Sequence, residues 1–254
     1  MWSTFHGKHV IPAIKRSLSD WGLNYFDLVY IHFPIALEYV DPKVRYPPGW
    51  TYDGQDEVRY AKTSLQETWR NMEEAVHQGL TKQIGISNYT GALILDLLSY
   101  AKIPPSVLQI EHHPYLTQPR LYFCYLYSVA NRRIELAQEN GIAVTGYSSF
   151  GPQSFVELEW KKATDEDVLF ENKIVKAAAS AHDVTPAQVL LRWATQRGIC
   201  VIPKSNNPKR LAQNLDCNSF DLTKKELDSI SALNKGLRFN DPSDYLKNPI
   251  RLFA

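Results

Sequence analysis

Five short apolar segments of this chain each end in polar side chains. These polar side chains are the first candidates for ligand binding or catalysis. They are His32, then Ser87 and Asn88, then Gln109 and Glu111, then Tyr147 and Ser148, and finally Lys204 and Ser205. Their imidazole, hydroxyl, amide, carboxylate and ammonium groups can bind and orient a polar ligand. Because the carboxyl ends of strands in a parallel barrel meet at one mouth, where active sites are built, the pattern predicts one shared site.

A second cluster has the composition of an anion-binding site. It consists of Lys204, Ser205, Asn206 and Arg210. A helix is predicted to begin near Asn207-Pro208, and the first turn of a helix offers free backbone N–H groups and the positive end of its dipole to an anion. The alternative to an anion site is a solvent-exposed loop and helix start without a ligand. Two charged residues among polar ones most often form such a surface.

The triplet Glu111-His112-His113 is composed of residue types that bind metals. Adjacent side chains on a strand point to opposite faces of the sheet, however, so the three cannot easily converge on one ion. We therefore expect no metal site at this position.

The elements that must position these residues alternate along the chain. Runs typical of buried strands lie at 28–33, 83–87, 107–111, 142–147 and 199–203, and helical patterns lie at 9–21, 64–78, 91–101, 134–140, 172–181 and 186–197. Such alternation predicts a parallel sheet, either doubly wound or closed into a barrel. No GxGxxG turn follows a strand, which argues against a Rossmann domain. The polar strand ends favour a barrel, which needs eight strands, and Met1-Trp2 could be the remnant of a sixth.

Composition narrows the class of protein. The 254 residues are 44% hydrophobic and 22% charged, with a formal net charge of +1, which is typical of a folded globular protein and gives no reason to expect a nucleic acid or membrane partner. Cys124, Cys200 and Cys217 are too widely spaced for a disulfide framework or a zinc site, which favours a reducing compartment. With no leader-like or membrane-spanning apolar run, we expect a cytoplasmic protein.

Several motifs resemble those of the aldo-keto reductase family. They are DLVYIHFP at 27–34, IGISN at 84–88, LQIEHHPY at 108–115, GYSSFGPQS at 146–154 and IPKSN at 202–206, with GLRFNDP at 236–242 near the end. The sequences of these motifs are most similar to those of the fungal aldose (D-xylose) reductases of that family. The resemblance implies an α/β fold, the (β/α)8 TIM barrel, forming one domain over residues 1–254.

The resemblance also implies a reaction. NADPH, with NADH as the alternative, would transfer a hydride to the aldehyde carbon of an aldose such as D-xylose and so give the alditol. In this family a tyrosine supplies the proton, a lysine and an aspartate adjust the acidity of that tyrosine, and a histidine orients the carbonyl. Only the histidine is present here, as His32; by resemblance the other three, with the first two strands and most of the third, would lie before Met1.

The resemblance assigns the remaining site residues. Tyr147 taken alone would be a core-packing residue, but its place after the fourth strand and before Ser148 makes it the expected platform under the nicotinamide ring. The amide and hydroxyl side chains of Ser87, Asn88 and Gln109 would bind the nicotinamide carboxamide, or else only satisfy strand-end backbone groups. The rest of the cofactor would contact Ser148, Phe150, Gln153, Ser154, Glu157, Lys204, Ser205, Asn206, Arg210, Gln213 and Asn214. Lys204 and Arg210 would hold the adenosine 2′-phosphate, Glu157 a ribose, and Phe33 and Asn240 the sugar.

Two departures from the family pattern lead to further expectations. Residues 122–133 are surplus and begin with an aromatic run that is apolar on every side, and the family's first strands are missing. An error in the gene model, with an unread first exon and a short retained intron, would explain both. We expect the chain as written to be inactive and poorly folded. A monomer or a homodimer is expected.

Two other function classes remain open. A non-catalytic NADP-binding protein of reductase fold would bind the cofactor without turnover. A phosphate-binding barrel with other chemistry, such as an aldolase, would need a Schiff-base lysine, and the only lysine at a strand end is Lys204.

Overall fold

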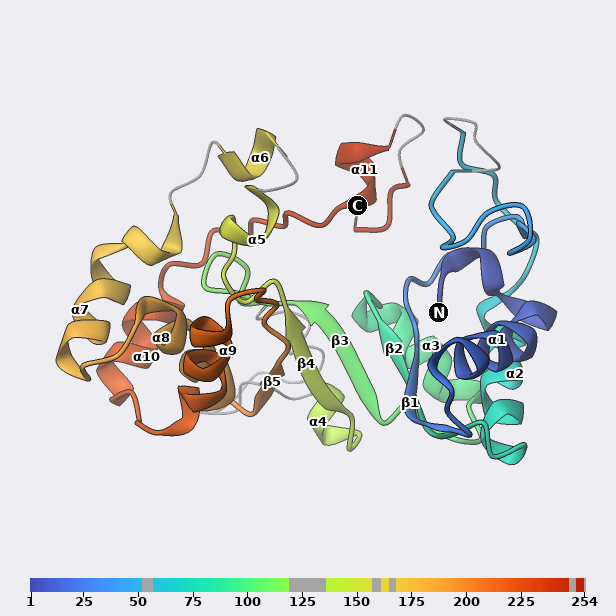
Figure 1. Ribbon diagram of the computed structural model, residues 1–254, viewed down its shortest axis with the longest axis horizontal. Helices are drawn as coiled ribbons and strands as arrows, with labels where there is room; N and C mark the ends of the chain where they lie inside the picture. The colour runs from blue at the N-terminus through green and yellow to red at the C-terminus, as the bar shows by residue number, and fades with distance from the viewer. Residues whose placement is uncertain (52–56, 119–135, 157–160, 165–167, 247–249, 254) are drawn as a thin grey trace. The chain divides into compact units, whose positions relative to one another are not determined.

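A computed structural model describes residues 1–51, 57–118, 136–156, 161–164, 168–246 and 250–253 (Figure 1). The described residues group into two compact units, one of residues 1–109 and 241–254 and the other of residues 110–240. The surplus segment 122–133 and Glu157 lie outside the described residues.

The first unit contains parallel strands with helices between them. Strands β1 (Phe26–Ile31), β2 (Thr81–Ser87) and β3 (Val107–Glu111) are hydrogen-bonded side by side, and β3 leads into the second unit. Helices α1 (Val10–Trp21), α2 (Leu65–His77) and α3 (Gly91–Tyr100) connect them, with two one-turn 3-10 helices, Ser3–Phe5 and Gly7–His9, and the short α11 (Pro242–Tyr245) completing the unit. Ile84↔Val29 and Ile86↔Leu108 are register partners.

The second unit repeats the pattern. Strands β4 (Ala143–Tyr147) and β5 (Ile199–Val201) are parallel neighbours, with Thr145 opposite Cys200. The main helices are α7 (Lys173–Ala181), α8 (Pro186–Thr195), α9 (Pro208–Leu215) and α10 (Lys224–Ser231). Single turns lie at α4 (Leu136–Glu139), α5 (Gln153–Val156), α6 (Lys161–Thr164), Leu169–Glu171 and Asp216–Asn218.

Local sequence explains where the long helices begin. The hydroxyl oxygens of Ser64, Thr90 and Thr185 each accept a hydrogen bond from the third backbone N–H of the helix that follows. These caps satisfy donors that a helix start would otherwise leave unpaired. At α8 the cap is a full capping box with Gln188, followed directly by proline at the first helical position.

The helices and strands of each unit bury large apolar side chains against one another. In the first unit Trp69 and Met72 of α2 are fully buried, as are Ile84 and Ile86 of β2. In the second unit Trp193 of α8 is fully buried beside β5. The buried area of such side chains is the main favourable contribution to folding.

All five predicted strands and six predicted helices are present among the described residues, with ends that differ by a few residues. The first strand ends at Ile31 and the fifth at Val201, two residues earlier than predicted. Met1 is in no strand, but its amino group donates to Tyr30 O at 2.9 Å and its carbonyl accepts from His32 N at 3.0 Å, along the edge of β1. The sequence analysis had not identified α10, α11 or the single turns.

Candidate active site

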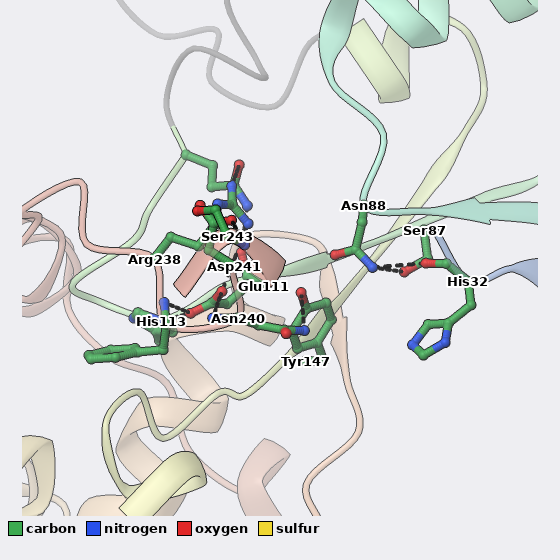
Figure 2. Close-up of polar contacts among 12 residues, drawn as sticks. His32, Ser87, Asn88, Glu111, His113, Tyr147, Arg238, Asn240, Asp241 and Ser243 are labelled. Carbon is green, nitrogen blue, oxygen red and sulfur yellow. Dashed lines mark hydrogen bonds and ion pairs between the residues drawn. The ribbon is translucent and has the colours of Figure 1, made fainter. Parts of the chain in front are cut away.

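The strand ends of the first unit are tied together by one side chain. The amide nitrogen of Asn88 donates to the carbonyl oxygen of His32 at 2.9 Å and lies 3.1 Å from Ser87 Oγ (Figure 2). The backbone N–H of Asn88 donates to Gln109 O at 3.0 Å. Asn88 has a φ of 62°, in the left-handed region that asparagine tolerates better than most residues. The ends of β1, β2 and β3 are therefore held together by Asn88.

The imidazole of His32 lies among aromatic rings. Its centroid is 5.2 Å from that of Trp2 and 4.8 Å from that of Phe33, and Phe33 in turn lies 4.8 Å from Trp50. Burial, and then the positive charge of the amino terminus, lowers the pKa of His32 to about 4. Within the described ranges the ring has no hydrogen-bond partner. At neutral pH the imidazole is therefore uncharged and has an N–H to offer a ligand.

In the second unit Glu111 and His113 form a fully buried pair. His113 Nε2 lies 2.9 Å from Glu111 Oε1, whereas His112 stacks on Trp193 and lies 3.2 Å from Arg197 Nη1. The expected alternation of side chains along the strand is thus confirmed. The described residues contain no group of three or more ligands that could hold a metal ion.

Tyr147, the last residue of β4, is anchored at both ends. Its carbonyl oxygen accepts a hydrogen bond from His112 N at 3.1 Å, and its hydroxyl accepts one from Asn240 Nδ2 at 3.0 Å (Figure 2). Asn240 was expected to contact the sugar. The structure joins it to Tyr147 instead, and a contact with substrate stays a prediction for Asn240 and for Phe33, which is only 2% exposed.

A cavity of about 740 Å³ lies in the second unit beside the ends of β4 and β5. Ten of the predicted cofactor residues line it, namely Ser148, Phe150, Gln153, Ser154, Lys204, Ser205, Asn206, Arg210, Gln213 and Asn214. In the part of the chain that the structure describes, the side chains of Lys204 and Arg210 have no ion-pair partner. The cavity therefore combines a polar lining with two cations available to an anionic ligand.

One expectation about this cavity is wrong. The N–H groups at the start of α9 are not free, because Asn207 Oδ1 accepts from Lys209 N at 2.9 Å and Arg210 N at 3.2 Å. Pro208 has no N–H, and Asn207 N donates to Ser205 Oγ at 3.2 Å. Asparagine is one of the best helix caps and satisfies these donors itself. An anion at this position would depend on the Lys204 and Arg210 side chains and on the helix dipole.

Part of the cavity wall was not predicted from the sequence. Phe170, Glu171, Lys176 and the start of α8 also line it, and Lys176 forms an ion pair with Glu171. These residues come from helices and a single turn, so no strand-end signal marks them. Ser148, which was predicted, has a φ of 54° and accepts a hydrogen bond from Gly151 N at 2.8 Å, a tight turn that leads into α5.

The sequence of the chain is similar to those of known reductases. The family model described as "Aldo/keto reductase family" matches residues 2–235. The probable NAD(P)H-dependent D-xylose reductase of Emericella nidulans is 56% identical over 254 residues, which are 100% of this chain and 75% of that protein. The protein of the same name from Aspergillus terreus is 55% identical over 246 residues, 96% of this chain and 73% of that protein.

Solved structures give the same result. An aldose reductase from Giardia lamblia has a TM-score of 0.81 at 34% identity and covers 100% of this chain and 76% of its own. An aldose reductase from Schistosoma japonicum has a TM-score of 0.75 at 30% identity, with coverages of 94% and 68%. The expected fold class, the parallel α/β barrel of these reductases, is confirmed. The family match over residues 2–235 and the similarity to these relatives place the chain in the aldo/keto reductase family.

Proposed function

We propose that this protein uses NADPH, and NADH less readily, to reduce the aldehyde group of aldoses such as D-xylose to the alcohol. The observation that carries the proposal is the cavity of about 740 Å³ in the second unit, because ten residues predicted for cofactor binding line it. The relatives named above as NAD(P)H-dependent D-xylose reductases support the substrate and the cofactor.

The donor set of the cavity suits a phosphorylated adenosine. Lys204 and Arg210 would bind the 2′-phosphate, because each offers a cation without an ion-pair partner among the described residues. Gln213 and Asn214, on the last turns of α9, would face the adenine. Glu157, a candidate for the ribose, lies outside the described residues. Since NADH lacks the 2′-phosphate, it should bind more weakly.

The strand-end residues would act at the other end of the cofactor. Ser87, Asn88 and Gln109 would bind the carboxamide, and Tyr147 would support the nicotinamide ring. When bound, the cofactor supplies the hydride. The neutral imidazole of His32, with its pKa lowered to about 4, would donate a hydrogen bond to the substrate carbonyl oxygen, on which charge develops as the hydride arrives.

We also propose a domain organisation, an oligomeric state and a cellular location. One domain over residues 1–254, a monomeric or homodimeric state and a cytoplasmic location are consistent with the balanced charge and with the free thiols of Cys200 and Cys217. No helix among the described residues is long and apolar enough to cross a membrane. No observation on these residues favours the non-catalytic alternative.

The test begins with binding. The 254-residue chain is titrated with NADPH and NADH by calorimetry, and NADPH consumption is then followed with D-xylose present. We expect saturable NADPH binding that is tighter than NADH binding. Failure to bind either nicotinamide cofactor would refute the proposal.

A further inference from the structure

The carboxylate of Glu111 organises a segment far from it in sequence. Glu111 ends β3 and is fully buried, and its two oxygens accept hydrogen bonds from the backbone N–H groups of Phe239 at 2.8 Å and Asn240 at 2.9 Å. His113 Nε2 lies 2.9 Å from the first oxygen and Arg238 Nη1 3.8 Å from the second. The carboxylate thus fastens three consecutive residues, 238–240, to the end of the strand (Figure 2).

Three further contacts hold this segment in place. Phe239 is 1% exposed and packs against His113 and Phe155, with ring centroids 5.4 and 5.7 Å apart. Gln118 bridges both sides, because its Nε2 donates to Glu111 O at 2.6 Å and its Oε1 accepts from Arg238 at 3.1 Å. A buried charge that is hydrogen-bonded on every side fixes geometry, since each partner is costly to leave unpaired.

The segment 238–240 ends at Asn240, which contacts Tyr147, the proposed nicotinamide platform. With its backbone held by Glu111, Asn240 points its amide at Tyr147, and Nδ2 donates to the hydroxyl at 3.0 Å. The backbone of Tyr147 is held separately by His112 N. A tyrosine ring that is fixed only at Cα can swing about its side-chain bonds, whereas one also fixed at the hydroxyl cannot.

We infer that Glu111 and Asn240 are positioning residues that hold the ring of Tyr147 in the orientation required to support the nicotinamide. The inference rests on the proposed function, because it takes Tyr147 as the nicotinamide platform. Neither residue has to touch the cofactor, since each acts through the next. From the sequence, Glu111 was expected among the polar strand-end residues and Asn240 as a sugar contact, and no link between either residue and Tyr147 was predicted.

The test compares two ligands on the 254-residue chain. NADPH needs both the cavity and the platform, whereas adenosine 2′,5′-bisphosphate needs only the cavity. Asn240→Ala removes the donor and Tyr147→Phe removes the acceptor while keeping the ring. We expect each to weaken NADPH binding about 3- to 10-fold, the size of one neutral hydrogen bond, and the double variant to bind no more weakly than either. Binding of the bisphosphate should not change.

Glu111→Gln extends the test to the carboxylate. Glutamine keeps one acceptor oxygen but turns N–H groups toward backbone donors, so residues 238–240 lose part of their anchor. NADPH binding should weaken at least as much as in Asn240→Ala. The matched control is Glu226→Gln, because Glu226 also pairs with a histidine, His182 at 3.1 Å, and accepts from a backbone N–H, Thr223 at 2.7 Å, but contacts none of residues 238–240. This control should bind both ligands normally.

Different results overturn different statements. If the unaltered chain binds neither ligand, the proposed function fails and the inference with it. If it binds both, but the Asn240 and Tyr147 substitutions have additive effects or none, the function stands and the positioning role is wrong. If Glu111→Gln weakens both ligands equally, the network serves only stability, and the inference is again wrong.

Discussion

The side-chain amide of Asn88 and the backbone carbonyl of His32 are joined by a hydrogen bond of 2.9 Å, which connects the ends of β2 and β1. This hydrogen bond fixes the backbone of His32, the candidate catalytic histidine. Its donor, Asn88, has an unusual backbone conformation with a φ of 62°. Asparagine is one of the few residues that combine tolerance of this conformation with a donor of suitable length. Two substitutions can separate these contributions.

Asn88→Gly and Asn88→Ala should destabilise the protein to different extents. Both lose the hydrogen bond, which leaves a part-buried carbonyl unpaired at a cost of about 1 to 3 kcal/mol. Alanine adds a left-handed strain of about 1 to 2 kcal/mol, whereas glycine adds only an entropic cost of about 0.5 to 1 kcal/mol. The alanine variant should therefore be the less stable, as measured by urea unfolding. Equal stabilities would mean that the backbone conformation is not strained.

Stability should fall on acidification between pH 6.5 and 4. Burial, and then the charge of the amino terminus, lowers the pKa of His6 and of His32 from 6.5 to about 4. In that window the unfolded chain binds a proton that the folded chain does not, so stability decreases as the pH falls, and the loss is complete below the folded pKa. Each histidine contributes at most about 3 kcal/mol.

The measurement is urea unfolding at a series of pH values within this window. His32→Gln should reduce the pH dependence without abolishing it, because burial also lowers the pKa of His6 and of His112. His6→Gln serves as a second variant, since burial lowers the pKa of His6 to a similar value and the substitution should reduce the dependence to a similar extent. An unchanged slope in both variants would contradict the lowered pKa values.

The fold was readable from the sequence because buried strands and capped helices leave local signals. β2 and β3 are apolar runs, and Thr185 with Gln188 has the spacing of a capping box. The same signal exists at Thr223 and Glu226 for α10, which the sequence analysis did not use. Strand-end positions predicted Ser148, Lys204 and Ser205 of the cavity wall, because the ends of parallel strands lie on one side of the sheet, whereas residues such as Phe150 and Gln213 were predicted from the family resemblance.

The non-local contacts could not be read in this way. Asn240 and Tyr147 are 93 residues apart, and Glu111 and Phe239 are 128 apart, so no local pattern relates them. The free donors expected at α9 were wrong for a local reason, since Asn207 itself caps them. Whether an asparagine side chain caps its own helix or leaves it open to a ligand depends on one rotamer, which the sequence does not specify.

Gly85 should not tolerate alanine. A Cβ there would lie 2.9 Å from Val107 O and 2.9 Å from Tyr30 Cδ1, and the carbonyl belongs to the paired strand β3, so it cannot move without disturbing the register. We expect a loss of about 1 to 3 kcal/mol in the free energy of unfolding. Gly49→Ala is the matched control, because its Cβ would meet only Arg45 at ordinary contact distances of 3.7 Å or more. If the two variants unfold at the same urea concentration, the close approach at Gly85 is wrong.

Arg210→Ala should change the preference between the two cofactors. The guanidinium lines the cavity and has no ion-pair partner among the described residues, so a 2′-phosphate is its expected partner. Loss of a hydrogen bond to a charged group costs about 1.5 to 3 kcal/mol, and we expect the lower end because Arg210 is exposed to solvent. The dissociation constant for NADPH should rise by about tenfold while that for NADH stays nearly constant.

Lys209→Ala removes the same charge from the neighbouring position, which does not line the cavity, and should alter neither constant. Calorimetric titration of both variants with both cofactors decides the matter, since equal weakening of NADPH and NADH binding by Arg210→Ala would exclude it as the phosphate ligand.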